Sequence, residues 1–438
     1  MAELQNGMPS FLPSCHPFLP SSHSFLPSCH PFLPSCHPAI LQLTMLFSAR
    51  FPAHLAPNRL AHALHAHRAA GRSILDLTVS NPTRAGFEYP VDLLAPLGDA
   101  RGLRYAPTPL GAMDARRAVA ADFARQGLEV PPERIVLTAS TSDAYGTLFK
   151  LLANAGDEIL IPRPSYPLFD HLTRLDLVDP RPYELEYHGS WSIDFPSLER
   201  ATTTRTRAVV VVSPNNPTGS CIGRDELDRL AAFCGPRGIA IIADEVFADY
   251  ELEPGSAAGA GRVAARQDVL SFALGGLSKS IGLPQVKLGW FAVAGPQQHV
   301  AAALERIEFV CDSYLPVATP VQLAAAELLA RGATVRDQIA ARVAANYRHL
   351  HAAAAAAPSC RVLCSDGGWY AVIHVPSYEP EEDLVVRLLM TDGVLAHPGY
   401  FFDFPDESYL VVGLLAAPAD FGEGVGRILR YFARKAGP

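Results

Sequence analysis

The chain has 438 residues, of which 49% are hydrophobic and 18% are charged, and its formal net charge is −8. This length is too great for one compact core, so the sequence predicts a large domain and a smaller one. An acidic chain without Lys/Arg runs is a poor partner for nucleic acid or an anionic membrane, and the sequence holds no run of about 18 uncharged apolar residues that would span a bilayer.

The first 44 residues have an unusual composition. They contain one charged side chain, Glu3, and 8 of the 38 prolines, and residues 11–38 are four copies of a unit close to Phe-Leu-Pro-Ser-Cys-His-Pro. Because proline removes backbone donors and blocks helices, we expect residues 1–44 to be a disordered low-complexity segment, or a mis-called start with Met45 as the first residue. A soft-metal site on the repeated cysteines and histidines is the less favoured alternative, and we predict no metal site.

The rest of the chain is predicted to contain two domains joined by an arm. Residues 45–98 form the N-terminal arm that joins the small domain, and residues 99–325 form the large domain. In the large domain short β-branched runs alternate with helical patterns, which is typical of a three-layer αβα fold with a mostly parallel central sheet. Residues 326–438 begin with Ala-rich helical stretches and continue as a short meander, which predicts a smaller α+β domain. The scattered cysteines after the repeat favour a cytoplasmic protein.

Several polar side chains follow the predicted strands, at the edge where parallel sheets place their ligands. Asn216 stands in a loop fixed by two prolines and a glycine, Asp244 ends the next strand, and Lys279 follows the strand after that. A hydroxyl-rich helix start, suited to a phosphate, follows an earlier strand and comprises Ser140, Thr141 and Ser142. A lysine, an aspartate, an asparagine and a phosphate cup together are what pyridoxal phosphate requires.

From about Leu75 to Leu429 these motifs and their order resemble the class I/II aminotransferases, which are pyridoxal-phosphate enzymes of fold type I. The resemblance implies that Lys279 forms the Schiff base and later moves the proton at the substrate's Cα. It implies that Asp244 pairs with the pyridinium nitrogen and that Asn216 donates to the ring's 3-oxygen. Further implied cofactor contacts are stacking by Tyr166, the phosphate contacts of Ser140, Thr141, Ser142, Ser278 and Lys287, and Tyr105 reaching the neighbouring subunit's phosphate. The resemblance therefore also implies a homodimer with shared active sites.

Three positions depart from the family's pattern. Phe247 stands where the family usually has a tyrosine that donates to the 3-oxygen, and Lys287 stands where it usually has an arginine on the phosphate. The strand at 408–415 contains no arginine, although the family usually holds the substrate carboxylate with one there. In its place we consider Arg84, beside Ser80 and Asn81 in the predicted substrate loop, and further back Arg104 and His397.

The function expected from this resemblance is transfer of an amino group between an amino acid and a 2-oxo acid. The Gly-Leu-Ser-Lys form of the lysine motif resembles alanine-type enzymes, a hint of a small or apolar donor, but the sequence does not name the substrate. A non-transaminating enzyme of the same fold (a β-lyase, decarboxylase or cyclase) and a non-catalytic fold relative stay open. Each residue also has a structural interpretation: Asn216 as a turn residue, the serines as a helix cap, the tyrosines as ordinary half-buried side chains, and Arg84 as a surface cation.

Overall fold

The computed structural model describes residues 48–52, 56–406 and 408–436. The repeat and Met45 lie outside these ranges, so the expectations for residues 1–44 stay predictions. No helix in the described ranges is long and apolar enough to cross a membrane.

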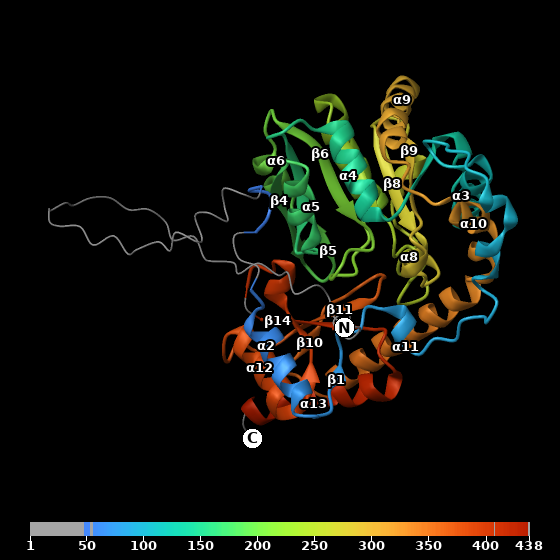
Figure 1. Cartoon of the computed structure of the whole chain (residues 1–438). Coiled ribbons are helices and arrows are strands. Elements are labelled where there is room, and N and C mark those ends of the chain that lie inside the picture. Colours follow the sequence, from blue (N-terminus) through green and yellow to red (C-terminus); the bar gives the residue numbers. More distant parts are fainter. Residues whose placement is uncertain (1–47, 53–55, 407, 437–438) are drawn as a thin grey trace, which may run out of the picture.

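An eight-stranded sheet organises the larger part of the molecule (Figure 1). Its order is β2-β9-β8-β7-β6-β3-β4-β5. The strands are β2 (Ile135–Thr138), β3 (Glu158–Arg163), β4 (Asp179–Tyr187), β5 (Trp191–Ile193), β6 (Thr206–Val212), β7 (Ala240–Asp244), β8 (Ser271–Gly276) and β9 (Gly289–Ala294). The central strands from β8 to β4 pair in parallel, whereas β9 runs antiparallel to both of its neighbours and β5 runs antiparallel to β4. The mostly parallel sheet predicted from the β-branched runs is confirmed.

Helices cover both faces of this sheet and bury its apolar side chains. One buried cluster joins the sheet to α4 (Thr141–Leu152), α5 (Leu168–Leu175) and α9 (Gln297–Tyr314). A second cluster, on different side chains of the same strands, joins it to α3 (Met113–Arg125), α6 (Phe195–Ala201), α7 (Arg224–Cys234) and α10 (Thr319–Arg331). Since alternate residues of a strand point to opposite faces, these two clusters are the two helix–sheet layers of an αβα sandwich.

A four-stranded sheet with the order β10-β11-β14-β13 forms the core of the smaller part, which lies below the large sheet in Figure 1. All of its pairs are antiparallel. Its strands are β10 (Arg361–Val362), β11 (Tyr370–His374), β13 (His397–Pro398) and β14 (Tyr409–Gly413). The helices that accompany it are α11 (Ala333–Ala355), α12 (Glu381–Asp392) and α13 (Pro418–Ala436). The predicted boundary at 325 falls inside α10, whose Ala324 and Leu328 both belong to a large-sheet cluster. The domain limits therefore stay a proposal.

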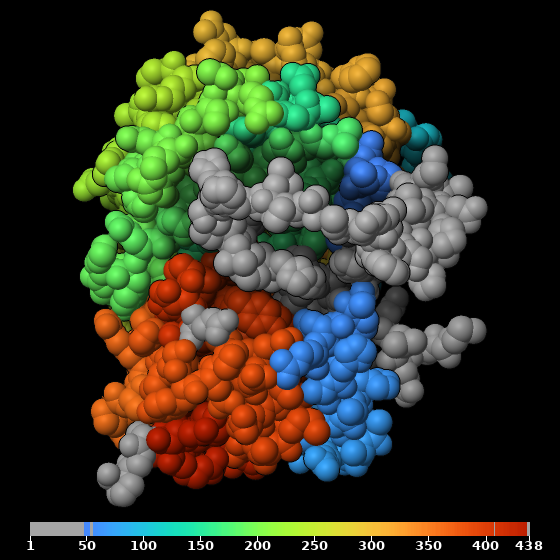
Figure 2. Space-filling view, turned by 90° about the vertical axis from the view of Figure 1, so that its left-hand side faces the viewer, coloured from blue at the N-terminus to red at the C-terminus, as the bar shows by residue number. Residues whose placement is uncertain are grey.

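The N-terminal segment lies against the smaller part, as the blue and orange surfaces show in Figure 2. Helix α2 (Arg59–Ala69) contacts α12, and β1 (Leu75–Asp76) pairs with β12 (Val394–Leu395). The segment then crosses the end of β14, where the Gly413 amide donates to the Leu77 carbonyl at 2.6 Å. A Cβ at Gly413 would lie 2.8 Å from the Val79 carbonyl oxygen, so only glycine permits this approach.

Candidate active site

Three of the predicted residues meet because they follow neighbouring parallel strands. In register, Asp244 at the end of β7 pairs with Val212 of β6 and with Leu274 of β8. The loop with Asn216 follows β6, and the helix α8 (Leu277–Ser280) with Lys279 follows β8. Parallel strands present their carboxyl ends at one edge, so all three side chains belong to the same edge of the sheet.

Asp244 is a buried carboxylate with two donors. The Tyr145 hydroxyl of α4 donates to Oδ2 at 3.1 Å, and the Val246 amide donates to Oδ1 at 3.2 Å. Burial raises the pKa of Asp244 to about 6, while these hydrogen bonds and the attraction of Lys279 oppose the rise. A buried carboxylate with a raised pKa is stabilised by a cation, which a protonated pyridine nitrogen would provide.

Lys279 carries an amine in low-polarity surroundings. Burial lowers its pKa to about 8, and attraction to Asp244 limits the fall. The Tyr250 hydroxyl donates to the Lys279 backbone carbonyl, which fixes the short helix that bears the amine. An amine whose pKa is near neutral pH has an appreciable neutral fraction, as nucleophilic attack on an aldehyde requires.

Asn216 stands in a loop that neighbouring segments hold from two sides. The Asn215 side-chain amide donates to the Pro164 carbonyl at 3.0 Å, and the Ser165 hydroxyl donates to Asn215 Oδ1 at 3.1 Å. On the other side the amides of Asp366 and Gly367 both donate to the Gly219 carbonyl at 2.9 Å. Asn216 is 8% exposed, and its Oδ1 has no hydrogen-bond partner among the described residues. An orphaned buried amide atom at this position fits a site whose ligand supplies the partner.

The predicted phosphate cup lies at the start of α4. Ser140 is the N-cap and accepts from the Asp143 amide at 3.2 Å, so the capping role is real, and the positive end of the helix dipole lies in the same place. A Cβ at Gly289 would lie 2.8 Å from the Ser140 carbonyl carbon, so glycine in β9 lets the cap approach the sheet. Ser278 is half-buried beside Lys279, whereas Lys287 is exposed, with a left-handed backbone (φ 58°).

The structure places the other predicted contact residues in different surroundings: Ser80 and Tyr166 lie near Tyr370, whereas Asn81 and Tyr105 are exposed. Ser80 forms a hydrogen bond with the Tyr370 hydroxyl, and Tyr166 lies near enough to Tyr370 to raise its pKa, after the larger effect of burial. Ser80, Tyr166 and Tyr370 thus bring the N-terminal segment, the large sheet and the small sheet together. Asn81 instead caps a short 3-10 turn by accepting from the Thr83 amide at 3.0 Å. Tyr105 is 76% exposed and lies on the surface of the single chain.

Comparison with known proteins identifies the family. The family described as aminotransferase class I and II matches residues 73–417. The chain belongs to the class I and II aminotransferases. Its reaction is pyridoxal-phosphate-dependent transamination, so the expected enzyme class is confirmed. The match to solved aminotransferase structures confirms the expected fold class. The non-transaminating and non-catalytic alternatives are therefore set aside.

Two relatives and two solved structures show the extent of the similarity. The aminotransferase is 27% identical over 404 residues to the alanine aminotransferase of Mycobacterium tuberculosis, which covers 88% of this chain and 90% of the relative. It is 25% identical over 360 residues to the human tyrosine aminotransferase, which covers 78% of this chain and 77% of the relative. Its fold matches the alanine aminotransferase of Pyrococcus furiosus with a TM-score of 0.77 at 21% identity, over 86% of this chain and 96% of that one. An aminotransferase from Mycobacterium tuberculosis matches with a TM-score of 0.75 at 22% identity, over 89% and 99%.

The three side chains considered for the substrate carboxylate, Arg84, Arg104 and His397, do not include a buried cation. Arg84 and Arg104 are exposed in the single chain. His397 pairs with Val411 across β13 and β14, and burial lowers its pKa to about 4, so the imidazole is neutral at pH 7. The His397 imidazole therefore carries no positive charge at pH 7 that could hold a carboxylate.

Two aromatic side chains of the site were missed as functional residues. Tyr145, the hydroxyl donor to Asp244, lies one helical turn after Thr141, so its position on the helix that starts the phosphate cup was a usable signal. Trp369, which follows Gly367 and Gly368 in the sequence, lies with its ring beside the Lys279 amine. Its proximity depends on how the two sheets meet, which no local pattern reports.

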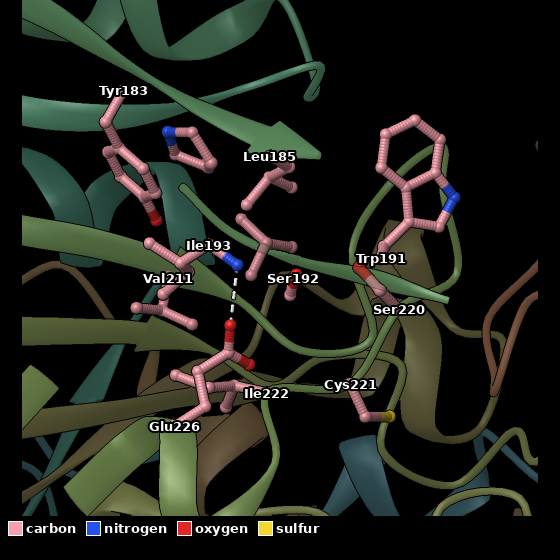
Figure 3. Close-up of a pocket in the computed structure, with 12 residues that line it drawn as sticks. Tyr183, Leu185, Trp191, Ser192, Ile193, Val211, Ser220, Cys221, Ile222 and Glu226 are labelled. Atoms are coloured by element: carbon pink, nitrogen blue, oxygen red, sulfur yellow. Dashed lines mark hydrogen bonds between the residues drawn. The ribbon is translucent and has the colours of Figure 1, made fainter. Parts of the chain in front are cut away.

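A separate pocket is lined in part by Ser220, Cys221 and Ile222, which follow the Asn216 loop in the chain (Figure 3). Its lining is mostly apolar and comes from β3, β4, β5, β6, α7 and residues 220–222. Within it the Glu226 carboxylate accepts from the Ile193 amide at 2.6 Å. The lining includes none of the side chains predicted to contact the cofactor. In the described ranges no group of three or more acidic, histidine or cysteine side chains is placed to hold a metal ion.

Proposed function

We propose that this aminotransferase holds pyridoxal phosphate at the carboxyl edge of the large sheet, with Lys279, Asp244 and Asn216 as its catalytic residues. The observation that carries the proposal is that a depressed-pKa amine, a raised-pKa carboxylate and an orphaned buried amide occupy one sheet edge. Ser140, Thr141, Ser142, Ser278 and Lys287 would hold the phosphate, and Tyr166 would lie against the ring.

Each of these residues has a definite task. When bound, the cofactor supplies an aldehyde for amine exchange and an electron-accepting ring. Lys279 Nζ would hold the cofactor covalently at rest and, once released, would accept the proton from the substrate's Cα and deliver it to C4′, the carbon that carried the cofactor's aldehyde. Asp244 keeps a proton on the ring nitrogen, and Tyr145 orients that carboxylate through its 3.1 Å hydrogen bond. Asn216 donates to the ring's 3-oxygen once its amide is oriented with the NH₂ group toward it.

The substrates are an amino acid and a 2-oxo acid, and a small apolar amino donor is the specific proposal. The Gly-Leu-Ser-Lys motif and the relatives named alanine aminotransferase support it. Ser80, Asn81 and Arg84 are proposed as substrate contacts, with Arg84 as the cation for the carboxylate. Ser80 has the firmest support, because its hydrogen bond to Tyr370 ties the N-terminal segment to the small sheet.

An amino-acid panel tests this assignment. Cofactor-loaded protein is mixed with single amino acids without any acceptor, and conversion of the cofactor to its amine form is followed by absorbance. Conversion by alanine and other small apolar amino acids, reversed by 2-oxo acids, is the expected result. Oxo-acid release without the amine form would contradict transamination at this site. Equal turnover of acidic or basic amino acids would contradict the small-donor assignment.

We infer that the active enzyme is a homodimer in the cytoplasm. Support for the dimer comes from the 76% exposed Tyr105, which the family resemblance implies to reach a neighbouring subunit's phosphate, and from other exposed apolar side chains such as Leu103 (91%) and Val91 (106%). Such apolar exposure is costly unless another surface covers it. The cytoplasmic location is supported by the five described cysteines, which are all free thiols, because thiols are kept reduced in the cytoplasm.

Mixing two inactive chains tests the shared site. A hybrid of a Lys279→Ala chain with a Tyr105→Ala chain contains one complete site only if Tyr105 acts on its partner's cofactor. Activity that returns on mixing therefore supports the shared site. If the mixture stays as inactive as its components, although sedimentation shows the hybrid dimer, Tyr105 has no role across the interface.

A further inference from the structure

The Lys279 amine lies against aromatic ring faces. Nζ is 4.8 Å from the centroid of the Trp369 ring and 5.7 Å from that of Phe247. Trp369 packs between Phe247 and Tyr250, with ring centroids 5.2 Å apart in both pairs. Ring faces carry partial negative charge, and both distances to Nζ are within the range at which a ring attracts an ammonium group.

The Trp369 ring is held firmly in this position, although it comes from the segment that precedes β11 of the small sheet. The Gly368 amide donates to the Tyr250 carbonyl at 2.7 Å, and the Leu252 amide donates to the Asp366 carbonyl at 3.0 Å. A Cβ at Gly367 would lie 2.8 Å from the Tyr250 carbonyl oxygen, so glycine is needed for this close approach. Trp369 is 1% exposed. The small sheet thus contributes a fixed ring to an amine carried by the large one.

The charged and titratable groups around the amine are few. Asp244 at the end of β7 is the carboxylate that attracts Lys279, and Glu245 and Tyr145 act on Asp244 in turn. From the following turn Tyr250 donates to the Lys279 carbonyl and not to the amine. Phe247 offers a ring face and no hydroxyl. Ring faces and one carboxylate therefore dominate the surroundings of Nζ.

We propose that Trp369 is a positioning residue that holds the Lys279 ammonium from the small sheet, and so ties the catalytic amine to the contact between the two parts of the chain. The proposal rests on the assignment of Lys279 as the catalytic amine. Trp369 acts on the Lys279 amine while that amine is not bound to the cofactor. In these periods the four-carbon lysine side chain would otherwise sample several rotamers. The ring favours the conformation and the protonation state in which the amine faces it.

Two physical effects of Trp369 on the amine have opposite signs. If the ring attracts the ammonium group, its removal makes the amine easier to deprotonate. If the ring only excludes water, its removal admits solvent, and the amine becomes harder to deprotonate. The direction of change in the Lys279 titration therefore distinguishes the proposed role from simple packing.

The experiment measures that titration in cofactor-free protein. The chain has only four lysines, so acylation by a small amine reagent at a series of pH values, followed by peptide mass spectrometry, reports Lys279 with Lys150, Lys287 and Lys435 as internal references. For Trp369→Leu we expect the Lys279 midpoint to fall by about 0.5–1 pH unit from the wild-type value, with the reference lysines unchanged. Trp369→Phe keeps a weaker ring face and is expected to shift the midpoint less, in the same direction.

Trp191→Leu is the matched control. Trp191 is also buried (9% exposed), and its ring packs on Tyr187 and Phe404, so its removal should leave the Lys279 midpoint unchanged. A rise or no change in Trp369→Leu would overturn the proposal. Should that variant fail to fold by circular dichroism, the same outcomes in Trp369→Phe decide. Because no cofactor is present, this result is independent of whether Lys279→Ala abolishes cofactor attachment, which tests the proposed function itself.

Discussion

The Tyr145 hydroxyl donates a hydrogen bond to Asp244 Oδ2 at 3.1 Å and joins the helix that begins the predicted phosphate cup to the carboxylate predicted to bind the ring nitrogen. Burial and the nearby Asp244 charge raise the pKa of Tyr145 well above its ordinary value, so the phenol is a donor across the physiological range. One contact thus orients two parts of the candidate cofactor site.

Removing this donor should weaken cofactor binding. Tyr145→Phe leaves Asp244 with one fewer donor, which raises the pKa of the carboxylate further and weakens its pairing with a cation. Because a hydrogen bond to a charged group contributes about 1.5–3 kcal/mol, we expect at least a roughly 10-fold rise in the Kd for the cofactor, measured by titrating cofactor-free protein and following absorbance. Tyr183→Phe removes another buried hydroxyl, bonded to the Val210 carbonyl at 2.8 Å, and should leave the Kd unchanged. Equal losses in both variants would contradict the role given to Tyr145.

Neutralising Asp244 should stabilise the cofactor-free protein while it impairs function. Since the folded pKa of about 6 is above the ordinary value of 3.8, the folded state binds the proton more tightly, and the ionised carboxylate destabilises the fold above pH 6. Asp244→Asn should therefore raise the free energy of unfolding by about 1–3 kcal/mol at pH 7.5, and this gain should disappear toward pH 4. Denaturant unfolding at both pH values measures it, with Asp312→Asn, which changes an exposed aspartate of α9, as control. A less stable variant at pH 7.5 would show that Asp244 is satisfied without the cofactor.

Restoring the family's tyrosine at Phe247 should change the titration of the bound cofactor. Phe247 is 4% exposed, with its ring 5.7 Å from Lys279 Nζ. A hydroxyl there would donate to the 3-oxygen and stabilise its negative charge, so the nitrogen linked to Lys279 should lose its proton at lower pH. We expect the pH midpoint of the visible band to fall in Phe247→Tyr and to stay constant in Phe404→Tyr, which changes another buried phenylalanine. An unchanged midpoint in Phe247→Tyr would mean that the added hydroxyl does not reach the cofactor.

The repeat at the front should be dispensable. The family match begins at residue 73, well after the near-chargeless segment 1–44. A chain that begins at Met45 should keep the visible spectrum, the dimer and the turnover of the full chain. Loss of any of these, with circular dichroism unchanged, would assign a role to residues 1–44.

The arrangement of the site followed from the sequence because it depends on topology. The runs that became β6, β7 and β8 are continuous and apolar, as strands buried on both faces must be, and parallel strands bring their following loops together. Asn216, Asp244 and Lys279 could therefore be assigned to one edge before any contact was known.

What the sequence did not predict depends on contacts between distant segments. Strand β4 contains Pro180 and Pro182 and several exposed charged residues, so it has no buried-strand pattern, yet it extends the sheet from β3. The reversed direction of β9 and the approach of Trp369 to Lys279 are set by how elements pack. The exposure of Arg84 and the burial of His397, which leaves its imidazole neutral, likewise depend on packing and have no signal in the sequence.

The central claim is that Lys279 carries the cofactor, and borohydride trapping tests it most directly. Protein loaded with pyridoxal phosphate is reduced, digested and mapped by mass spectrometry. We predict that the modification falls on the peptide containing Lys279 and that Lys279→Ala loses both the visible band and the modification, while Lys150→Ala, which changes a lysine paired with Asp176, keeps them. Attachment to Lys150, Lys287 or Lys435 instead, or a visible band that persists in Lys279→Ala, would contradict the account.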